Sequence, residues 1–565
     1  MFDFTKAQQE AIETLDRNVS VSAGAGSGKT RVLVERFVNI LRQSLRQGGK
    51  QVSAADILAI TFTRKAAGEM KDRVRRRLAE LEQEDALHAS FWRQQLELLE
   101  QARINTIHGF CNSLLKENPV EAGLDPAFQV AEEVEMDEFL LRTVQQFVKQ
   151  GLRRGDSDIL RLADEYTAAD VVKQLLLAIP KMDAILNFGD LLQPYQAKLN
   201  EKNVLQGQLQ ELLQELAEDR MKVKASAHRQ KLELLREHLP ELLKAAADSG
   251  KSENMTLLDS YVGTLAATSS DKAVVKAAKE ILQQLHLLAA DAAALELIPC
   301  WQQALVACSA YLREQQELNN MLGFDDLESR ALELLKNNRQ VCSKNSSRYQ
   351  YIMVDEFQDT NERQRELVYL LCGGDKDRLL GHKLFVVGDA KQSIYRFRGA
   401  DVSVFARVRR DIAGAGGSNI VLDDNFRTVD KVLDLCNLAF AALLGEDRQQ
   451  DVYFEALNAN RATDILPEML AIAYDKESKA CRREAEAAVI AERILQLHTE
   501  KQIAYEDMVI LLGALTAAKS FASALQQAGI PYTIVDGKGF YERREIIDMI
   551  TLFPYTTLFR SPGNY

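Results

Sequence analysis

The sequence contains a run of small residues that ends in a lysine and a hydroxyl, SAGAGSGKT at residues 22–30. Small residues let successive backbone N–H groups turn inward around an anion at the positive end of a helix. Lys29 would then place its charge on the β- and γ-phosphates of a nucleotide, and the Thr30 hydroxyl would ligate Mg²⁺. Ala23 replaces the first glycine of the usual pattern, and a small residue suffices there. The residues predicted to surround the phosphates are Ala23, Gly24, Ala25, Gly26, Ser27, Gly28, Lys29 and Thr30.

Two adjacent carboxylates form the second candidate element, in YIMVDEFQD at residues 351–359. The mostly apolar residues before them predict a buried strand, and ligands bind at the carboxyl edge of such strands in open α/β sheets. Asp355 would hold Mg²⁺ through its water shell, and Glu356 would orient and deprotonate the water that attacks ATP. Two carboxylates after a strand are also common on protein surfaces, but the phosphate loop upstream favours the ATPase interpretation.

A third strand-like run opens the segment VVGDAKQSIYRFRGAD, residues 386–401. Gln392 can hydrogen-bond both the attacking water and the γ-phosphate, so it is predicted to distinguish ATP from ADP. Tyr395, Phe397 and Arg398 combine two aromatic rings with a cation, and single-stranded bases stack on exposed rings with little regard to sequence. For the two rings taken alone, burial in the core is the better interpretation, because most aromatic side chains lie there.

Two further strand ends carry candidate nucleic-acid contacts. Phe62, Thr63 and Arg64 stand between a strand-like run and a helix N-terminus suited to a phosphate or a base. Thr106 and His108 occupy a similar place in TIHGFC, although a single histidine more often has a structural role. At both places the predicted contact depends on strand ends meeting at one edge of a sheet.

Two single residues are further candidates for the nucleotide site. Gln8 in TKAQ fits a helix capping box with Thr5, and contact with adenine is an equally good interpretation of it from the residues alone. Arg427 in DDNFRT follows a strand and would reach the γ-phosphate as an arginine finger.

These residues require a sheet that brings several strand ends together. Short β-like runs alternate with helical segments in residues 1–111 and again in 322–428, which predicts a parallel sheet with helices on both faces. Between them, residues 112–321 have helical spacing, as in VLQGQLQELLQELA at 204–217, and predict an inserted helical subdomain. The strands of the sheet are expected at residues 19–22, 57–61, 104–107, 351–356, 383–389 and 419–425.

A second α/β region is predicted over residues 429–552, with strands at 471–474, 508–512 and 531–535. It ends before a full sheet is complete. The predicted fold class is therefore α/β, with a P-loop nucleotide-binding parallel sheet, a large helical insertion and an incomplete second domain.

Composition sets further bounds on the protein. A chain of 565 residues exceeds one ordinary domain, and a net charge of −12 argues against a protein that is basic all over, while leaving room for a local basic groove. The seven cysteines are scattered without metal-ligand spacing, which predicts a reducing cytoplasm and neither zinc nor an iron–sulfur cluster. The sequence shows no signal region and no apolar run of about 20 residues, so no membrane partner is expected.

The motifs, taken in order over most of the chain, resemble superfamily 1 DNA helicases of the UvrD/Rep type. AKQSIYRFRGAD and the long helical insertion are more similar to the AddA and RecB helicase–nuclease subunits, because the UvrD-like branch usually has Trp where this chain has Phe397. The resemblance implies a RecA-like domain, ATP and Mg²⁺ as cofactors, and ATP-driven 3′→5′ movement on single-stranded DNA, with unwinding from duplex ends in double-strand-break repair. It also implies a second helicase/nuclease subunit as a candidate partner. The matching motifs are FTKAQQEAI, SAGAGSGKT, TFTRKAAGEM, TIHGFC, FDDL, VDEFQDTN, GDAKQSIYRFRGAD, NFRT and IPYTIVDGKGFYERREIID.

The resemblance also implies roles for single residues. Gln8 would read adenine, with Phe426 and Arg31 flanking the ring. The side chains implied to contact phosphates are Lys29, Gln392 and Arg427. The side chains implied to lie along single-stranded DNA are Phe62, Tyr395, Phe397 and Arg398.

The end of the chain departs from the family. A TIHxxKGLE-like segment, a final Arg-bearing helix and a RecB-type nuclease signature are absent from the sequence, and residues 553–565 are expected to be a non-native or truncation tail. Because ATP in this family lies between two RecA-like domains, the 565-residue chain by itself is expected to bind nucleotide weakly and not to unwind DNA. Two other functions stay open: a DNA-stimulated ATPase that translocates without unwinding, and a nucleotide-dependent DNA clamp. The intact Glu356 and Gln392 argue against the clamp.

Overall fold

The computed structural model of the chain divides into two compact units, residues 1–462 and 463–565. The residues that the structure describes are 4–46, 51–182, 185, 202–217, 237–244, 272–445, 451–472 and 479–535. The residues predicted to contact nucleotide or DNA all lie in the first unit.

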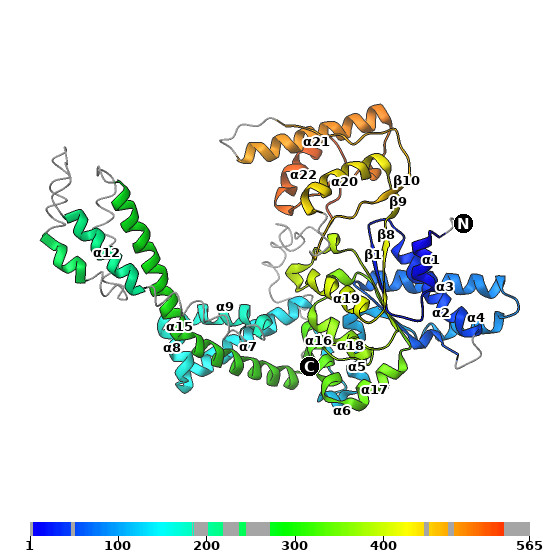
Figure 1. The fold of residues 1–565 in the computed structure, drawn as a ribbon, viewed down its shortest axis with the longest axis horizontal. Helices are drawn as coiled ribbons and strands as arrows, with labels where there is room; N and C mark the ends of the chain where they lie inside the picture. The colour runs from blue at the N-terminus through cyan, green and yellow to red at the C-terminus, as the bar shows by residue number, and fades with distance from the viewer. Residues whose placement is uncertain are drawn as a thin grey trace, which may run out of the picture. The chain divides into compact units, whose positions relative to one another are not determined.

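The first unit is built on a six-stranded sheet in the order β3-β2-β6-β7-β1-β8, and every neighbouring pair is parallel (Figure 1). Every residue of β1, β2 and β7 is buried, as expected for strands covered on both faces. The predicted α/β class with a parallel sheet is therefore confirmed. The strands are β1 (Val19–Ala23), β2 (Ile57–Thr61), β3 (Arg103–Thr106), β6 (Tyr351–Val354), β7 (Leu384–Gly388) and β8 (Ser418–Leu422).

Helices cover both faces of this sheet, each over its own apolar cluster. One cluster contains Phe37 and Val74 from the helices after β1 and β2, and the other contains Phe110, Leu327 and Val404. The helices over the first face are α1 (Lys6–Glu13), α2 (Lys29–Arg46), α3 (Arg64–Glu84) and α4 (Ala89–Leu98). Those over the second face are α5 (Ile107–Glu117), α16 (Phe324–Asn337), α17 (Arg339–Arg348), α18 (Glu362–Leu371) and α19 (Val402–Gly414).

Capping residues start three of these helices at the candidate site. Thr5 caps α1 in a full capping box with Gln8, Thr63 accepts from the Ala66 N–H at the start of α3, and Thr106 accepts from the Gly109 N–H at the start of α5. Short 3₁₀ turns follow the ends of β6 and β7 at η3 (Phe357–Asp359), η4 (Ala390–Gln392) and η5 (Arg396–Arg398). The carboxyl ends of the strands therefore pass directly into the segments that carry the candidate chemistry.

The inserted segment between the two halves of the sheet is helical, as predicted, over its described part. It leaves and returns at a short parallel ladder between β4 (Gln129–Val130) and β5 (Met321–Leu322). Because α5 continues past residue 111 into the core of the sheet domain, we propose that the insertion begins near residue 132 rather than 112. Its helices are α6 (Pro119–Ala122) before this ladder, then α7 (Glu133–Arg154), α8 (Ser157–Glu165), α9 (Ala168–Ala178), α12 (Lys202–Ala217) and α15 (Lys272–Leu318).

A small ladder that was not predicted follows the central sheet. β9 (Asp424–Val429) pairs in parallel with β10 (Asn458–Arg461), and α20 (Asp430–Leu444) connects them. The predicted boundary at residue 428 falls inside β9, whereas the compact unit extends to residue 462. We propose that the first domain includes this ladder.

The second unit contains α21 (Lys479–Lys501), η6 (Tyr505–Asp507), η7 (Leu515–Ala517) and α22 (Ala518–Gln527), with a small core around Ala491, Leu525 and Ile530. The strands predicted at residues 508–512 and 531–535 are not formed: these residues are extended or bent without a pairing partner. Strand pairing supplies the hydrogen bonds that an apolar run needs, and no strand lies within the described part of this unit. The prediction at 471–474 lies partly outside the described residues, and those on 536–552 and the tail 553–565 lie wholly outside them.

Among the described helices, none is both long enough and apolar enough to span a lipid bilayer.

Candidate nucleotide and nucleic-acid site

The loop between β1 and α2 has the backbone of a phosphate-binding loop. Gly26 and Gly28 have positive φ angles of 75° and 85°, and the Ser27 hydroxyl donates to the Gly24 carbonyl at 2.8 Å. A Cβ on Gly26 would lie 2.8 Å from Cβ of Arg427, so glycine is required there both by conformation and by space. Ala23 ends β1, Ala25 lies in the turn, and Lys29 and Thr30 open α2.

Lys29 and Glu356 form an ion pair across the site. Nζ of Lys29 lies 3.0 and 3.1 Å from the two carboxylate oxygens of Glu356. Glu356 itself has a left-handed backbone with φ of 50°, and its N–H donates to the Asp355 carboxylate at 2.9 Å. A non-glycine residue in this conformation is strained, and such strain concentrates at functional sites.

The carboxyl group of Asp355 is held in an environment suited to a cation. Burial and the neighbouring Glu356 charge raise the pKa of Asp355 to about 6, although Lys29 opposes the shift. The same two causes raise the pKa of Asp359 to about 6. A divalent cation would offset the cost of ionised carboxylates here.

In the part of the chain that the structure describes, no cluster of three or more His, Cys, Asp or Glu side chains forms a complete metal cage. Mg²⁺ in nucleotide sites is held by one or two protein groups together with phosphates and water, so Thr30 and Asp355 fit this mode. The donor set therefore agrees with a Mg²⁺–nucleotide and not with a resident metal.

The amides that follow β6 and β7 connect the two strand ends. The Gln358 amide donates to Glu356 at 2.9 Å and accepts from the Asp389 N–H at 2.9 Å. The Gln392 amide donates to the Asp389 carboxylate at 2.7 Å, and Lys391 lies 3.3 Å from the same carboxylate. Sequence reasoning selected Gln392 but missed Gln358, although Gln358 stands within the DEFQD motif.

The NFRT segment lies directly on the phosphate loop. The Asn425 side chain donates to the Ala25 carbonyl at 2.6 Å, and the Phe426 N–H donates to the Gly26 carbonyl at 3.0 Å. Asn425 also accepts from the Arg427 N–H at 2.9 Å. The structure thus brings Phe426 and Arg427 to the loop, and Asn425, which sequence reasoning missed, holds them there.

The residues predicted at the adenine end have partners within the protein. The Gln8 amide donates to the Ser27 carbonyl at 2.9 Å and accepts from the Thr5 N–H at 3.1 Å, so the predicted capping box is formed. The Arg31 guanidinium lies 4.2 Å from the centre of the Phe4 ring. Contact of Gln8, Arg31 and Phe426 with adenine stays a prediction.

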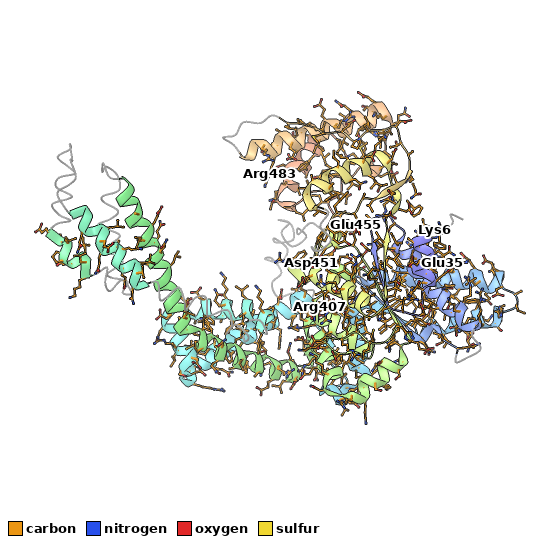
Figure 2. All side chains as sticks on the ribbon, viewed as in Figure 1. Lys6, Glu35, Arg407, Asp451, Glu455 and Arg483 are labelled. Carbon is orange, nitrogen blue, oxygen red and sulfur yellow. The ribbon has the colours of Figure 1, made fainter. Side chains whose placement is uncertain are left out.

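A segment that sequence reasoning missed also covers the phosphate loop. The Leu457 side chain lies where a Cβ on Gly24 would sit, and Leu457 is held by two hydrogen bonds between its backbone and Asn437 of α20. Glu455 accepts from the Ser22 hydroxyl at 3.1 Å, and Figure 2 labels it. No motif marks this segment in the sequence.

Three aromatic rings form a row beside the candidate ATP site. The Phe62 and Tyr395 ring centres are 4.6 Å apart, and those of Tyr395 and Phe397 are 6.0 Å apart. Phe397 is 79% exposed, so it is not a core residue. Thr63 and Arg64 are exposed at the adjoining start of α3. Arg398 ends η5, and its side chain lies outside the described part.

The other predicted DNA-contact pair is tied to a buried carboxylate. Thr106 is buried as the N-cap of α5, and Nε2 of His108 lies 3.0 Å from Glu328 of α16. Glu328 also accepts from Asn361 and Gln364, which begin α18. Burial alone would raise the pKa of Glu328, but the hydrogen bonds from His108, Gln364 and Asn361 outweigh it and hold the pKa below its usual value.

A phosphate loop followed by a helix, with acidic and amide residues at neighbouring strand ends of a parallel sheet, defines a P-loop nucleoside triphosphatase. Residues 4–413 match the UvrD/REP helicase N-terminal domain family, so the chain belongs to that family. Residues 420–557 match the UvrD-like helicase C-terminal domain.

Curated relatives are named as the AddA subunit of an ATP-dependent helicase/nuclease. The protein of Levilactobacillus brevis is 27% identical over 99% of this chain and 52% of its own length. The protein of Exiguobacterium sibiricum is 28% identical over 99% and 52%, and that of Staphylococcus aureus is 26% identical over 96% and 49%. The chain therefore spans about half the length of these relatives.

Proposed function

We propose that the chain is the motor part of an ATP-dependent DNA helicase of the AddA helicase/nuclease type, moving 3′→5′ on single-stranded DNA. One observation carries the proposal: residues 389–397 run without interruption from the buried carboxylates of the ATP site to the exposed aromatic row. A segment of this kind places the chemistry of hydrolysis and a surface for base stacking on one rigid sheet edge.

In this mechanism the loop N–H groups and Lys29 bind the phosphates of ATP. Bound Mg²⁺, held by Thr30 and Asp355, neutralises phosphate charge. Lys29 must leave Glu356 to reach the phosphates, and its departure frees the Glu356 carboxylate to take a proton from the attacking water. Gln392 and Arg427 contact the γ-phosphate.

The DNA side of the mechanism uses the row Phe62–Tyr395–Phe397 with Thr63, Arg64, His108 and Arg398 beside it. Stacking on such rings tolerates any sequence, which suits movement along DNA. We include in the proposal duplex ends as the starting point, double-strand-break repair as the process, a second helicase/nuclease subunit as the partner, and the cytoplasm, where DNA and ATP occur together.

The test measures ATP hydrolysis with and without a single-stranded oligonucleotide, then strand displacement on 3′-tailed, 5′-tailed and blunt duplexes. It uses the longest natural form that carries this sequence, with Glu356→Gln as the inactive control. The proposal predicts DNA-stimulated hydrolysis and displacement from the 3′ tail. Stimulated hydrolysis without displacement would support the translocase, and tight nucleotide-dependent DNA binding without turnover would support the clamp.

A further inference from the structure

Gln358 is a buried amide with all of its polar atoms in use. It is 1% exposed, and its Nε2 donates to Glu356 at 2.9 Å and to Asp359 at 3.1 Å. Its Oε1 accepts from the Asp389 N–H at 2.9 Å. An amide is the one neutral side chain that combines two donors with an acceptor, so glutamine alone satisfies all three partners at this length.

The segment after β7 approaches this amide closely. A Cβ on Gly388 would lie 2.7 Å from Oε1 of Gln358, so glycine is required for the approach. The Ser393 hydroxyl donates to the Gln358 carbonyl at 3.1 Å. Gln358 therefore contacts the segment of residues 388–393 through both its side chain and its backbone, two residues before Tyr395 of the aromatic row.

The Glu356 carboxylate accepts hydrogen bonds from two side chains in the described part of the chain, Lys29 and Gln358. When Lys29 turns to the phosphates of ATP, as the proposed function requires, Gln358 remains as the donor that orients Glu356. The residue that orients the base is thus the residue bonded to the segment that leads to DNA.

We propose that Gln358 is a positioning residue that holds Glu356 for proton abstraction and links its orientation to residues 389–393, so that DNA on the aromatic row stimulates hydrolysis. The inference rests on the proposed function and adds a route between its two sites. DNA that shifts Tyr395 moves Ser393 and Asp389, and these two residues bond to Gln358. Energetic coupling of this kind needs a contiguous chain of contacts, and each contact here is a direct hydrogen bond.

The experiment compares Gln358→Glu, which keeps the shape but loses both N–H donors, with Gln95→Glu as control. Gln95 is likewise buried, and its Oε1 accepts from the Ala54 N–H at 2.8 Å away from the candidate site. Thermal melting of each variant shows that it is folded. The measured quantities are affinity for a slowly hydrolysed ATP analogue and single-turnover ATP hydrolysis with and without single-stranded DNA.

For Gln358→Glu we expect nucleotide affinity within about twofold of the unsubstituted protein. DNA-stimulated hydrolysis should fall about 10–100-fold, as for other side chains that orient a reactive group, and the ratio of stimulated to basal rate should approach one. Gln95→Glu should keep both rates. If Gln358→Glu fails to fold, Ser393→Ala serves as the second variant, and its stimulation ratio should drop.

Unchanged stimulation in a folded Gln358→Glu, or in Ser393→Ala where that variant replaces it, would overturn the role of Gln358 and leave the proposed function intact. Equal loss of nucleotide binding and hydrolysis would also overturn it, because the amide would then be a part of the binding site. Absence of DNA stimulation in the unsubstituted protein would overturn the proposed function itself, together with the coupling role.

Discussion

At the scale of single residues, the ion pair between Lys29 and Glu356 joins two groups that hydrolysis needs apart. Lys29 holds both oxygens of the carboxylate, and Glu356 is strained at its backbone. A carboxylate bonded to a lysine is a poor base, since the positive charge stabilises its ionised form. The pairing therefore keeps Glu356 unreactive until the lysine has phosphates to bind.

Lys29→Ala and Glu356→Gln separate the roles of this pair. Lys29→Ala should weaken both ATP binding and hydrolysis, because the cation that faces the phosphates is lost. Glu356→Gln should keep ATP binding and slow hydrolysis by about 10²–10⁴-fold, the usual contribution of a general base. Equilibrium nucleotide binding and single-turnover hydrolysis measure the two effects. The same loss of binding in both variants would contradict the separate roles.

At the scale of elements, the end of β2 and the turns after β7 place three rings in a row. Phe62→Ala and Phe397→Ala should each weaken single-stranded DNA binding by about 1–3 kcal/mol if a base stacks on the ring, and leave ATP affinity without DNA nearly unchanged. Fluorescence anisotropy with a labelled oligonucleotide measures the change.

Leu87→Ala is the control for these variants, because Leu87 is an exposed apolar side chain away from the row. It should leave DNA affinity unchanged. Folded Phe397→Ala with full DNA affinity would show that the exposed ring is not a stacking surface. Loss of folding in Phe62→Ala would assign that half-buried ring to the core.

A second contact between elements is carried by Glu328, which is 4% exposed and joins α5, α16 and α18. The groups that face it are His108, Asp325 and Cys111. Because its folded pKa is lowered, the unfolded chain binds a proton first as the pH falls. Its contribution to the free energy of unfolding is thus complete above the ordinary carboxyl pKa and is lost toward lower pH.

Glu328→Gln should therefore destabilise the first unit by about 1–3 kcal/mol at neutral pH, with the difference shrinking below about pH 4.5. Urea unfolding at a series of pH values measures it. Glu333→Gln on the same helix is the control, since Glu333 forms an exposed ion pair with Arg313 and should contribute little at any pH. A difference for Glu328→Gln that does not change with pH would contradict the assigned ionisation.

At the scale of the whole molecule, the ATP loop depends on residues far along the chain. Asn425 and Phe426 bond to the loop, and Glu455 and Leu457 cover its start. All of these contacts precede residue 463, where the second unit begins. The first unit therefore holds a complete set of contacts to the loop within its described part.

A shortened chain of residues 1–462 should melt cooperatively and bind nucleotide within about twofold of the 565-residue chain. A chain of residues 1–428 should melt at lower temperature and bind more weakly, because it ends inside β9 and lacks β10, Asn437 and Leu457. Circular dichroism and a fluorescent ATP analogue measure the two properties. Equal behaviour of both shortened chains would place the domain boundary at residue 428.

Much of the fold was predictable because its signals are local. Six apolar runs bounded by turn residues predicted the six strands of the sheet, and threonines at their ends predicted helix starts. Two predicted strands in the second unit were wrong, since an apolar run becomes a strand only beside a partner. β9 and β10 were missed for the converse reason: polar residues such as Asn425 and Asn458 pair there through contacts that their own sequence does not announce.

The sequence by itself determined the phosphate loop, the carboxylate pair and Gln392, because glycine conformation and charge are properties of short segments. Only the tertiary structure decided which groups meet across it: Lys29 with Glu356, Gln358 with Asp389, and Leu457 with Gly24. These partners are separated by up to hundreds of residues and come together because six parallel strands end at one edge of the sheet. Pairings of this kind follow from strand order and burial, which no local pattern of residues encodes.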